Sequence, residues 1–167
     1  QEILLYSFKK GDNMYVLGIE STCDETAAAI VEDGRKVISN VISTSVKEQA
    51  LYGGVVPDLA SSEHLKKLPA LIAKISKSEY FSTAGEIAAT NGPGLPNCLA
   101  IGVAAASALA LKLGLSLRGV NHLRGHAYSP FIPVHAADPQ NFRANFAGLL
   151  PHLGLAVSGG NTILFEI

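Results

Sequence analysis

Residues 15–43 read YVLGIESTCDETAAAIVEDGRKVISNVIS, and this stretch decides the fold. Short apolar runs over 15–19, 26–31 and 37–43 predict three strands. A polar turn joins the first two runs, and Asp33-Gly34 is typical of a tight hairpin turn between the second and third. The chain is therefore expected to open with an antiparallel meander rather than with a βαβ unit.

After a break at Gly53-Gly54, helices and strands are expected to alternate. Pro57 suits the first position of a helix, and Pro69 inside the same apolar pattern predicts either a kink or two consecutive helices. A strand over 86–90 leads to a long helix from Pro96 to a stop at Gly114, and 117–120 predict another strand.

This order predicts an α/β fold with a mixed sheet, in which three antiparallel strands precede alternating helices and strands. It is the pattern of a ribonuclease-H-like lobe, as in actin-like ATPases. Residues 14–135 are expected to form this first lobe, and 1–13 an extension outside it. Residues 136–152 are expected to connect two lobes, in a proline-rich stretch from Ser129 to Pro151 that predicts irregular structure. Residues 153–167 predict the first two strands of a second lobe whose remainder is absent from this chain.

The composition fits one ordinary domain or a lobe of a larger protein, with 167 residues, of which 48% are hydrophobic and 16% charged. A net charge of -1 provides no overall attraction for nucleic acid, so any RNA contact needs a local patch or a partner. Cys23 and Cys98 lie far apart without a secretory signal, which favours free thiols in a cytoplasmic protein. The apolar run over 98–111 is shorter than the ~20 residues of a membrane span, so no membrane partner is expected.

Two histidines follow the predicted strand over 117–120. With Asn121 as the N-cap of a short helix, His122 and His126 fall one turn apart on one face and can hold a divalent metal. The alternative is that one histidine caps the helix end while the other packs at the surface. No glutamate lies between them, so this is not the helical zinc-protease motif. A third ligand is needed, and spacing selects none of the available residues, which are Asp24, His64, His135, Asp138 and His152.

Three turns could approach an anion. Ser158-Gly159-Gly160-Asn161 joins two apolar strands, and paired glycines let backbone N–H groups face a phosphate, although a simple hairpin turn fits equally. Ser21 and Thr22 occupy the matching turn of the first lobe. Asn91-Gly92-Pro93-Gly94 precedes a helix and suits a tight backbone approach, but no Gly-Lys-Ser/Thr follows it.

Five strings occur in order over 18–26, 53–61, 91–95, 120–126 and 157–162. Together they closely resemble the universal tRNA threonylcarbamoyl transferase family, of the TsaD type, formerly labelled O-sialoglycoprotein endopeptidase. The resemblance covers Tyr15 to Ile167. It implies a two-lobed actin-like ATPase fold. It also implies transfer of threonylcarbamoyl from threonylcarbamoyl-AMP to N6 of the adenosine next to the anticodon in tRNA.

The resemblance also assigns residues. His122 and His126 match the family's two metal histidines, which hold iron or zinc. The family's substrate-binding loop matches Ala156, Val157, Ser158, Gly159 and Gly160, with Ser21, Thr22 and Asn161 as further candidate phosphate contacts. The family's third ligand is an aspartate beyond residue 167, so this chain alone is expected to be inactive or nearly so.

The family works with tRNA and with small partner proteins, an ATPase and an inactive paralogue, partly through a helical interface on this lobe. Gly102, Ala104, Ala105 and Ala108 on the predicted helix over 96–113 could permit close helix approach, although ordinary internal packing explains them as well. Two positions depart from bacterial members: Arg124 stands where many carry Glu, and Asn161 where most carry His. The alternatives are a non-catalytic scaffold paralogue, which lacks the histidine pair, a metallopeptidase, and a sugar or acetate kinase.

Overall fold

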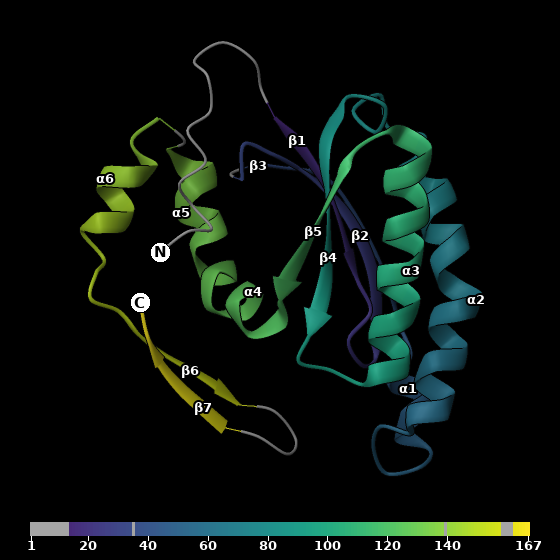
Figure 1. Cartoon of the computed structure of the whole chain (residues 1–167). Helices are drawn as coiled ribbons and strands as arrows, with labels where there is room; N and C mark the ends of the chain where they lie inside the picture. Colours follow the sequence, from purple (N-terminus) through teal and green to yellow (C-terminus); the bar gives the residue numbers. More distant parts are fainter. Residues whose placement is uncertain (1–13, 35, 139, 158–161) are drawn as a thin grey trace.

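The computed structural model describes residues 14–34, 36–138, 140–157 and 162–167 (Figure 1). Its central sheet has five strands in the order β3-β2-β1-β4-β5. Strands β1 (Tyr15–Glu20), β2 (Glu25–Glu32) and β3 (Lys36–Thr44) are antiparallel neighbours. Strands β4 (Ala84–Gly92) and β5 (Ser116–Asn121) extend the sheet in parallel with β1. The predicted α/β class and its mixed sheet are confirmed.

Helices α2 (Pro57–Ile75) and α3 (Pro96–Leu113) cover one face of the sheet, and the short helix α1 (Val46–Ala50) precedes them (Figure 1). Helix α2 runs through Pro69 as a single element, so the alternative of two consecutive helices is wrong. Helix α3 ends at Gly114 with a φ of 68°, the left-handed conformation that glycine adopts at least cost. The predicted stop signal is confirmed.

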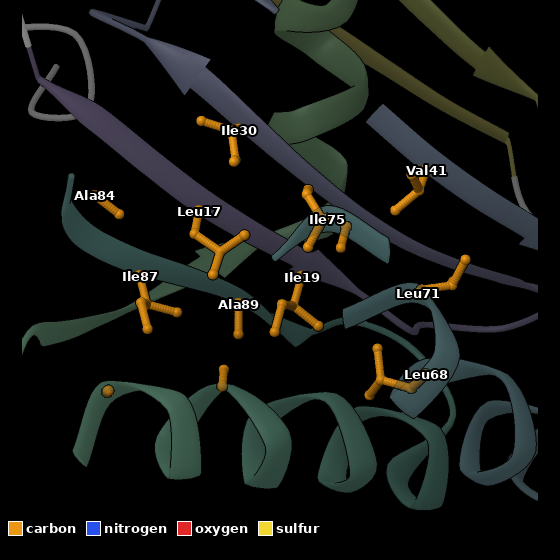
Figure 2. Packing of buried hydrophobic residues seen from close by; sticks show 13 residues of the cluster. Leu17, Ile19, Ile30, Val41, Leu68, Leu71, Ile75, Ala84, Ile87 and Ala89 are labelled. Carbon is orange, nitrogen blue, oxygen red and sulfur yellow. The ribbon is translucent and has the colours of Figure 1, made fainter. Parts of the chain in front are cut away.

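The core lies between the sheet and these two helices (Figure 2). Strands β1, β2 and β4 contribute alternate residues, because successive side chains point to opposite faces. The largest fully buried side chains of these strands are Leu17, Ile30 and Ile87, none more than 1% exposed. Helix α2 adds Leu68, Leu71 and Ile75, whereas α3 presents the small residues Ala106 and Ala110. Small side chains allow the backbone of α3 to lie close to β1 and β4.

Helix α3 is also the one helix in the described part of the chain that could cross a membrane by length and composition. Of this apolar window, 22% is buried, on the face that packs against the sheet. The expectation that the protein has no membrane partner stays a prediction.

The stretch from Ser129 to Pro151 is more regular than its prolines predict. It contains η1 (Ser129–Phe131), α5 (Ile132–Ala137) and α6 (Phe142–Ala147), which lie with α4 (His122–Tyr128) across the sheet from α2 and α3 (Figure 1). The expectation of irregular structure was wrong for these residues. Pro130 and Pro133 stand in the first turns of η1 and α5, where the N–H that proline lacks is not needed.

An aromatic cluster holds this helical segment together. The Phe131 ring, buried at 6% exposure, packs edge-on against Phe146 with centroids 4.9 Å apart and against His152 at 5.1 Å. Phe142 stacks on Phe146 at 5.4 Å, and Tyr128 lies 6.3 Å from it. The cluster links the end of α4, helix α6 and the start of the last hairpin.

Strands β6 (Leu153–Val157) and β7 (Thr162–Glu166) form a separate antiparallel pair, with Leu155 opposite Leu164. Both strands were predicted. One face of the pair carries large exposed apolar side chains, namely Leu153, Leu155, Val157 and Leu164. The residues that join the strands, 158–161, lie outside the described part of the chain.

Candidate metal centre

Three segments meet where β1, β4 and β5 end. Because these strands are parallel, their carboxyl ends lie at the same edge of the sheet, the usual place for ligand binding in α/β proteins. Strand β1 ends with Glu20, the turn after it provides Thr22, β4 provides Thr90, and β5 continues directly into α4. Residues from three distant parts of the sequence are therefore brought to one edge.

Asn121 places the histidine pair. Its side chain accepts hydrogen bonds from the backbone N–H groups of Leu123 at 3.0 Å and Arg124 at 3.2 Å, and so caps α4. The helix then carries His122 and His126 one turn apart, with ring centroids 4.5 Å apart and planes at 82°. The predicted helix and its N-cap are confirmed.

The two imidazole rings face each other through their Nε2 atoms. His122 Nε2 and His126 Nε2 are 3.1 Å apart. Two nitrogens bound to zinc at about 2.0–2.1 Å in tetrahedral geometry are about 3.3–3.4 Å from each other. The observed separation is close to this value, so the donor pair fits a divalent transition metal with little movement of the rings.

No further metal ligand joins the pair among the described residues, where no group of three His, Cys, Asp or Glu side chains could hold an ion. Three of the alternative ligands that the sequence left open lie elsewhere. His64 is buried under β2, His152 packs on Phe131, and Asp138 accepts hydrogen bonds from Asn141. The side chain of His135 lies outside the described residues. The described residues thus bring together two imidazole nitrogens, and a metal site at this pair stays a prediction.

Glu20 is the site residue that sequence reasoning missed. Its Oε1 accepts the backbone N–H of Thr22 at 2.6 Å, and its Oε2 accepts the Thr90 hydroxyl and lies 3.6 Å from His122 Nδ1. Burial would raise the pKa of this carboxyl, but the nearby His122 imidazole and the hydrogen bonds from Thr22 and Thr90 outweigh burial and lower the pKa to about 2. Glu20 is therefore a carboxylate at any physiological pH. The strand order supplies the only signal for this role, because it places the end of β1 two strands from the end of β5.

Ser21 and Thr22 are both buried. The Ser21 hydroxyl donates to the carbonyl of Cys98 at 2.9 Å, so it is already used within the fold. Thr22 Oγ1 lies 3.5 Å from His122 Nδ1, which turns it toward the histidine pair. A phosphate contact at either residue stays a prediction.

The loop at Asn91-Gly92-Pro93-Gly94 packs against the turn after β1 that contains Ser21 and Thr22. Leu95 N–H donates to the carbonyl of Thr22 at 3.0 Å, and a Cβ on Gly94 would lie only 3.0–3.2 Å from three atoms of Thr22. The tight backbone approach predicted for this loop is confirmed, and its target is the turn beside the histidines.

The predicted substrate loop begins at the end of β6, a strand that contacts α4 (Figure 1). Ala156 is half-buried and Val157 is exposed. Ser158, Gly159, Gly160 and Asn161 lie outside the described residues, so the structure leaves their role a prediction.

His64 and Cys23 have structural surroundings. The His64 ring is 1% exposed, with Nδ1 2.7 Å from the Thr26 hydroxyl and Nε2 3.2 Å from the Cys23 carbonyl. A carbonyl can only accept, so the proton is assigned to Nε2 and the Thr26 hydroxyl donates to Nδ1. Burial, followed by the charge of Asp24, raises the pKa of the Cys23 thiol, which is the opposite of nucleophile activation.

Acid is expected to destabilise the fold through His64. Burial lowers the pKa of this imidazole below its ordinary value of 6.5, so the unfolded state binds more protons than the folded state below that pH. The stabilising contribution is complete above about pH 6.5 and is lost as the pH falls. Urea unfolding at pH 7, 6 and 5 should show this loss, and His64→Gln should flatten it. His152→Gln is the control and should keep the wild-type slope. An unchanged slope in His64→Gln would contradict the assignment.

Comparison with known proteins identifies the family of this chain. The family model described as tRNA N6-adenosine threonylcarbamoyltransferase matches residues 36–167. Proteins of that name are 41% identical over 156 residues in Geobacter metallireducens and 45% identical over 152 residues in Anaeromyxobacter dehalogenans strain 2CP-C. These alignments cover 92% and 90% of this chain and 42% of each relative. The chain thus spans 42% of the length of the curated relatives it matches.

Two solved structures show weaker likeness. YeaZ from Pseudomonas aeruginosa matches with a TM-score of 0.46 and 19% identity, over 69% of this chain and 48% of that one. RuvC from T. thermophilus, solved with a Holliday junction substrate, has a TM-score of 0.46 and 11% identity, with 70% of each chain covered. The family model, by contrast, matches well over half of the chain, and with the similarity to the curated relatives it places this chain in the tRNA N6-adenosine threonylcarbamoyltransferase family.

Proposed function

We propose that this chain is the metal-binding part of an enzyme that modifies tRNA. The reaction would transfer threonylcarbamoyl from threonylcarbamoyl-AMP to N6 of the adenosine next to the anticodon. One observation carries the proposal: a chain of this family holds two imidazole Nε2 atoms 3.1 Å apart at the ligand-binding edge of its sheet. The chain alone is proposed to be inactive, because two donors do not complete a site.

His122 and His126 would hold one iron or zinc ion. When bound, the metal supplies a Lewis acid that can polarise the acyl carbonyl of the donor. The residues from Ala156 to Gly160 are proposed to bind the adenylate, since β6 contacts the helix that carries the histidines. Thr22 and Asn161 remain candidate phosphate contacts, whereas the Ser21 hydroxyl would first have to leave the Cys98 carbonyl.

The partners follow from the same assignment. tRNA is the proposed acceptor, and the near-neutral net charge of -1 favours sharing its binding with the partner proteins, an ATPase and an inactive paralogue. Between α2 and α3 lies an open apolar hollow of about 430 Å³, lined in part by Leu65, Ala104 and Ala105. It supports a protein contact on these helices. Both cysteines are free, which suits the cytoplasmic location that we propose.

The test is a histidine double variant of the full-length protein, His122→Ala with His126→Ala. We expect it to lose bound metal and to lose threonylcarbamoyl transfer to tRNA, because alanine offers no donor. His152→Ala removes an imidazole that packs on Phe131 and is the matched control, expected to keep its metal. Unchanged metal and transfer in the double variant would refute the site. Peptide cleavage without tRNA or threonylcarbamoyl-AMP would instead favour the peptidase alternative.

A further inference from the structure

We propose that Glu20 is the positioning residue of the histidine pair: its carboxylate faces His122 Nδ1, holds the ring proton on that nitrogen, and so leaves His122 Nε2 free to bind metal. This inference rests on the proposed function, since it deepens the same site. It concerns a residue that acts through His122 rather than on the metal directly.

The surroundings of the His122 ring decide which nitrogen carries its proton. Nδ1 faces two oxygens, Glu20 Oε2 at 3.6 Å and Thr22 Oγ1 at 3.5 Å. Among the described residues, Nε2 faces the Nε2 of His126 alone. A carboxylate can only accept a hydrogen bond, so it favours the ring form with the proton on Nδ1. The Thr22 hydroxyl could donate to Nδ1 in the other ring form. A hydrogen bond to a charged carboxylate is stronger than one from a neutral hydroxyl, so the form with the proton on Nδ1 is favoured. Nε2 is then unprotonated and directed at the second donor.

Glu20 is itself held by two hydrogen bonds. The backbone N–H of Thr22 donates to Oε1 and the hydroxyl of Thr90 donates to Oε2. Glu20 ends β1, Thr90 lies on β4, and His122 follows β5, so the interactions cross three neighbouring parallel strands. The sheet thereby holds the Glu20 carboxylate in position, and the carboxylate orients the His122 ring.

Glu20 is not placed to bind the metal directly. Its oxygen approaches the Nδ1 side of His122, while the nitrogen that faces His126 is on the other side of the ring. An ion between the two Nε2 atoms would therefore have His122 between itself and Glu20. A carboxylate behind a metal-binding histidine makes that histidine more basic and fixes its orientation, and its loss typically costs about 10–100-fold in metal affinity.

The first measurement is the ring form of His122. In the full-length, metal-free protein labelled with 15N-histidine, we expect long-range 1H–15N spectra to show His122 protonated on Nδ1. Glu20→Gln should give a mixture of the two ring forms. A purely structural role for Glu20 would not produce this change. Protonation of wild-type His122 on Nε2 would overturn the proposal.

The second measurement is affinity for Zn²⁺ alone, titrated against a competing chelator. We expect Glu20→Gln to bind about 10–100-fold more weakly than wild type. Glu86→Gln is the matched control, because Glu86 is a mostly buried carboxylate on β4 that pairs with Arg118 rather than with a histidine. It should bind Zn²⁺ as wild type does, and equal affinities in the two variants would overturn the proposal.

A third variant guards against misfolding of Glu20→Gln. Thr90→Val replaces the hydroxyl that donates to Glu20 with a methyl group and so removes one of its two hydrogen bonds. We expect about a fivefold loss of Zn²⁺ affinity, which corresponds to the net free energy of one hydrogen bond. Unchanged affinity here would also count against the proposal. If wild-type protein binds Zn²⁺ no better than the double variant at His122 and His126, the proposed function fails. The ring form of His122 reports on Glu20 independently of that result.

Discussion

Gly102→Val is expected to lower the free energy of unfolding by about 3 kcal/mol, at the upper end of the range for overpacked cores. Gly102 lies on the buried face of α3. A Cβ there would lie 2.1 Å from Ser21 Oγ and 3.2 Å from Ser21 Cβ, so the added atoms have no space. Ser21 cannot easily withdraw, because it is buried and its hydroxyl donates to the Cys98 carbonyl on the same helix. Ordinary internal packing therefore accounts for this glycine.

Urea denaturation of the chain measures this change. Gly125→Ala is the matched control, because Gly125 is also helical and nothing lies within 4 Å of its added Cβ. Alanine there should be neutral or should stabilise by up to about 1 kcal/mol, through helix propensity alone. A second check combines Gly102→Ala with Ser21→Ala, which removes the clashing oxygen. The double variant should lose less unfolding free energy than the two single variants lose in sum. Wild-type stability in Gly102→Val would show that this contact is not tight.

Phe131→Ala is expected to lower the free energy of unfolding by about 3 kcal/mol or more, as for other buried phenylalanines. The Phe131 ring is almost fully buried and contacts both Phe146 and His152 edge-on. Removing it opens a cavity at the centre of the aromatic cluster. Short helices such as α5 and α6 are not stable alone, so they depend on this packing.

Hydrogen exchange tests this prediction locally. In Phe131→Ala, the amides of α5 and α6 should exchange much faster, whereas those of β1 and β4 should keep their protection. Phe131→Leu keeps most of the apolar volume and should show a clearly smaller effect. Equal loss of protection in the central sheet would mean that the cluster belongs to the main core rather than to the connecting segment.

The central sheet could be predicted because its signals are local. Asp33 and Gly34 adopt φ angles of 52° and 64°, the left-handed pair that a tight hairpin turn requires and that Asp-Gly favours. The helix stop at Gly114 and the cap at Asn121 follow from equally short patterns. Each depends on residues within one turn, so sequence alone is sufficient to identify it.

The helical segment from Ser129 to Ala147 and the role of Glu20 could not be predicted, because both depend on contacts between distant residues. Prolines suggested irregular structure, but the Phe131 contacts with Phe146 and His152 stabilise short helices despite them. Glu20 meets His122 across 102 positions in sequence only because β4 enters the sheet between β1 and β5.

The junction at Asn121 has a consequence for protein engineering. One residue ends a strand, caps the following helix and sets the start of a histidine pair, so the donors stand at a fixed height and angle relative to the sheet. A designer could transfer this short unit to another parallel sheet, provided that the strand two places along in the sheet ends in a carboxylate. Insertion of a single residue before His122 would turn both imidazoles away from the edge by about 100°, the rotation per residue of an α-helix. The strand end, the Asn121 cap and the histidine pair can therefore be transferred together, but an inserted residue would misdirect the histidines.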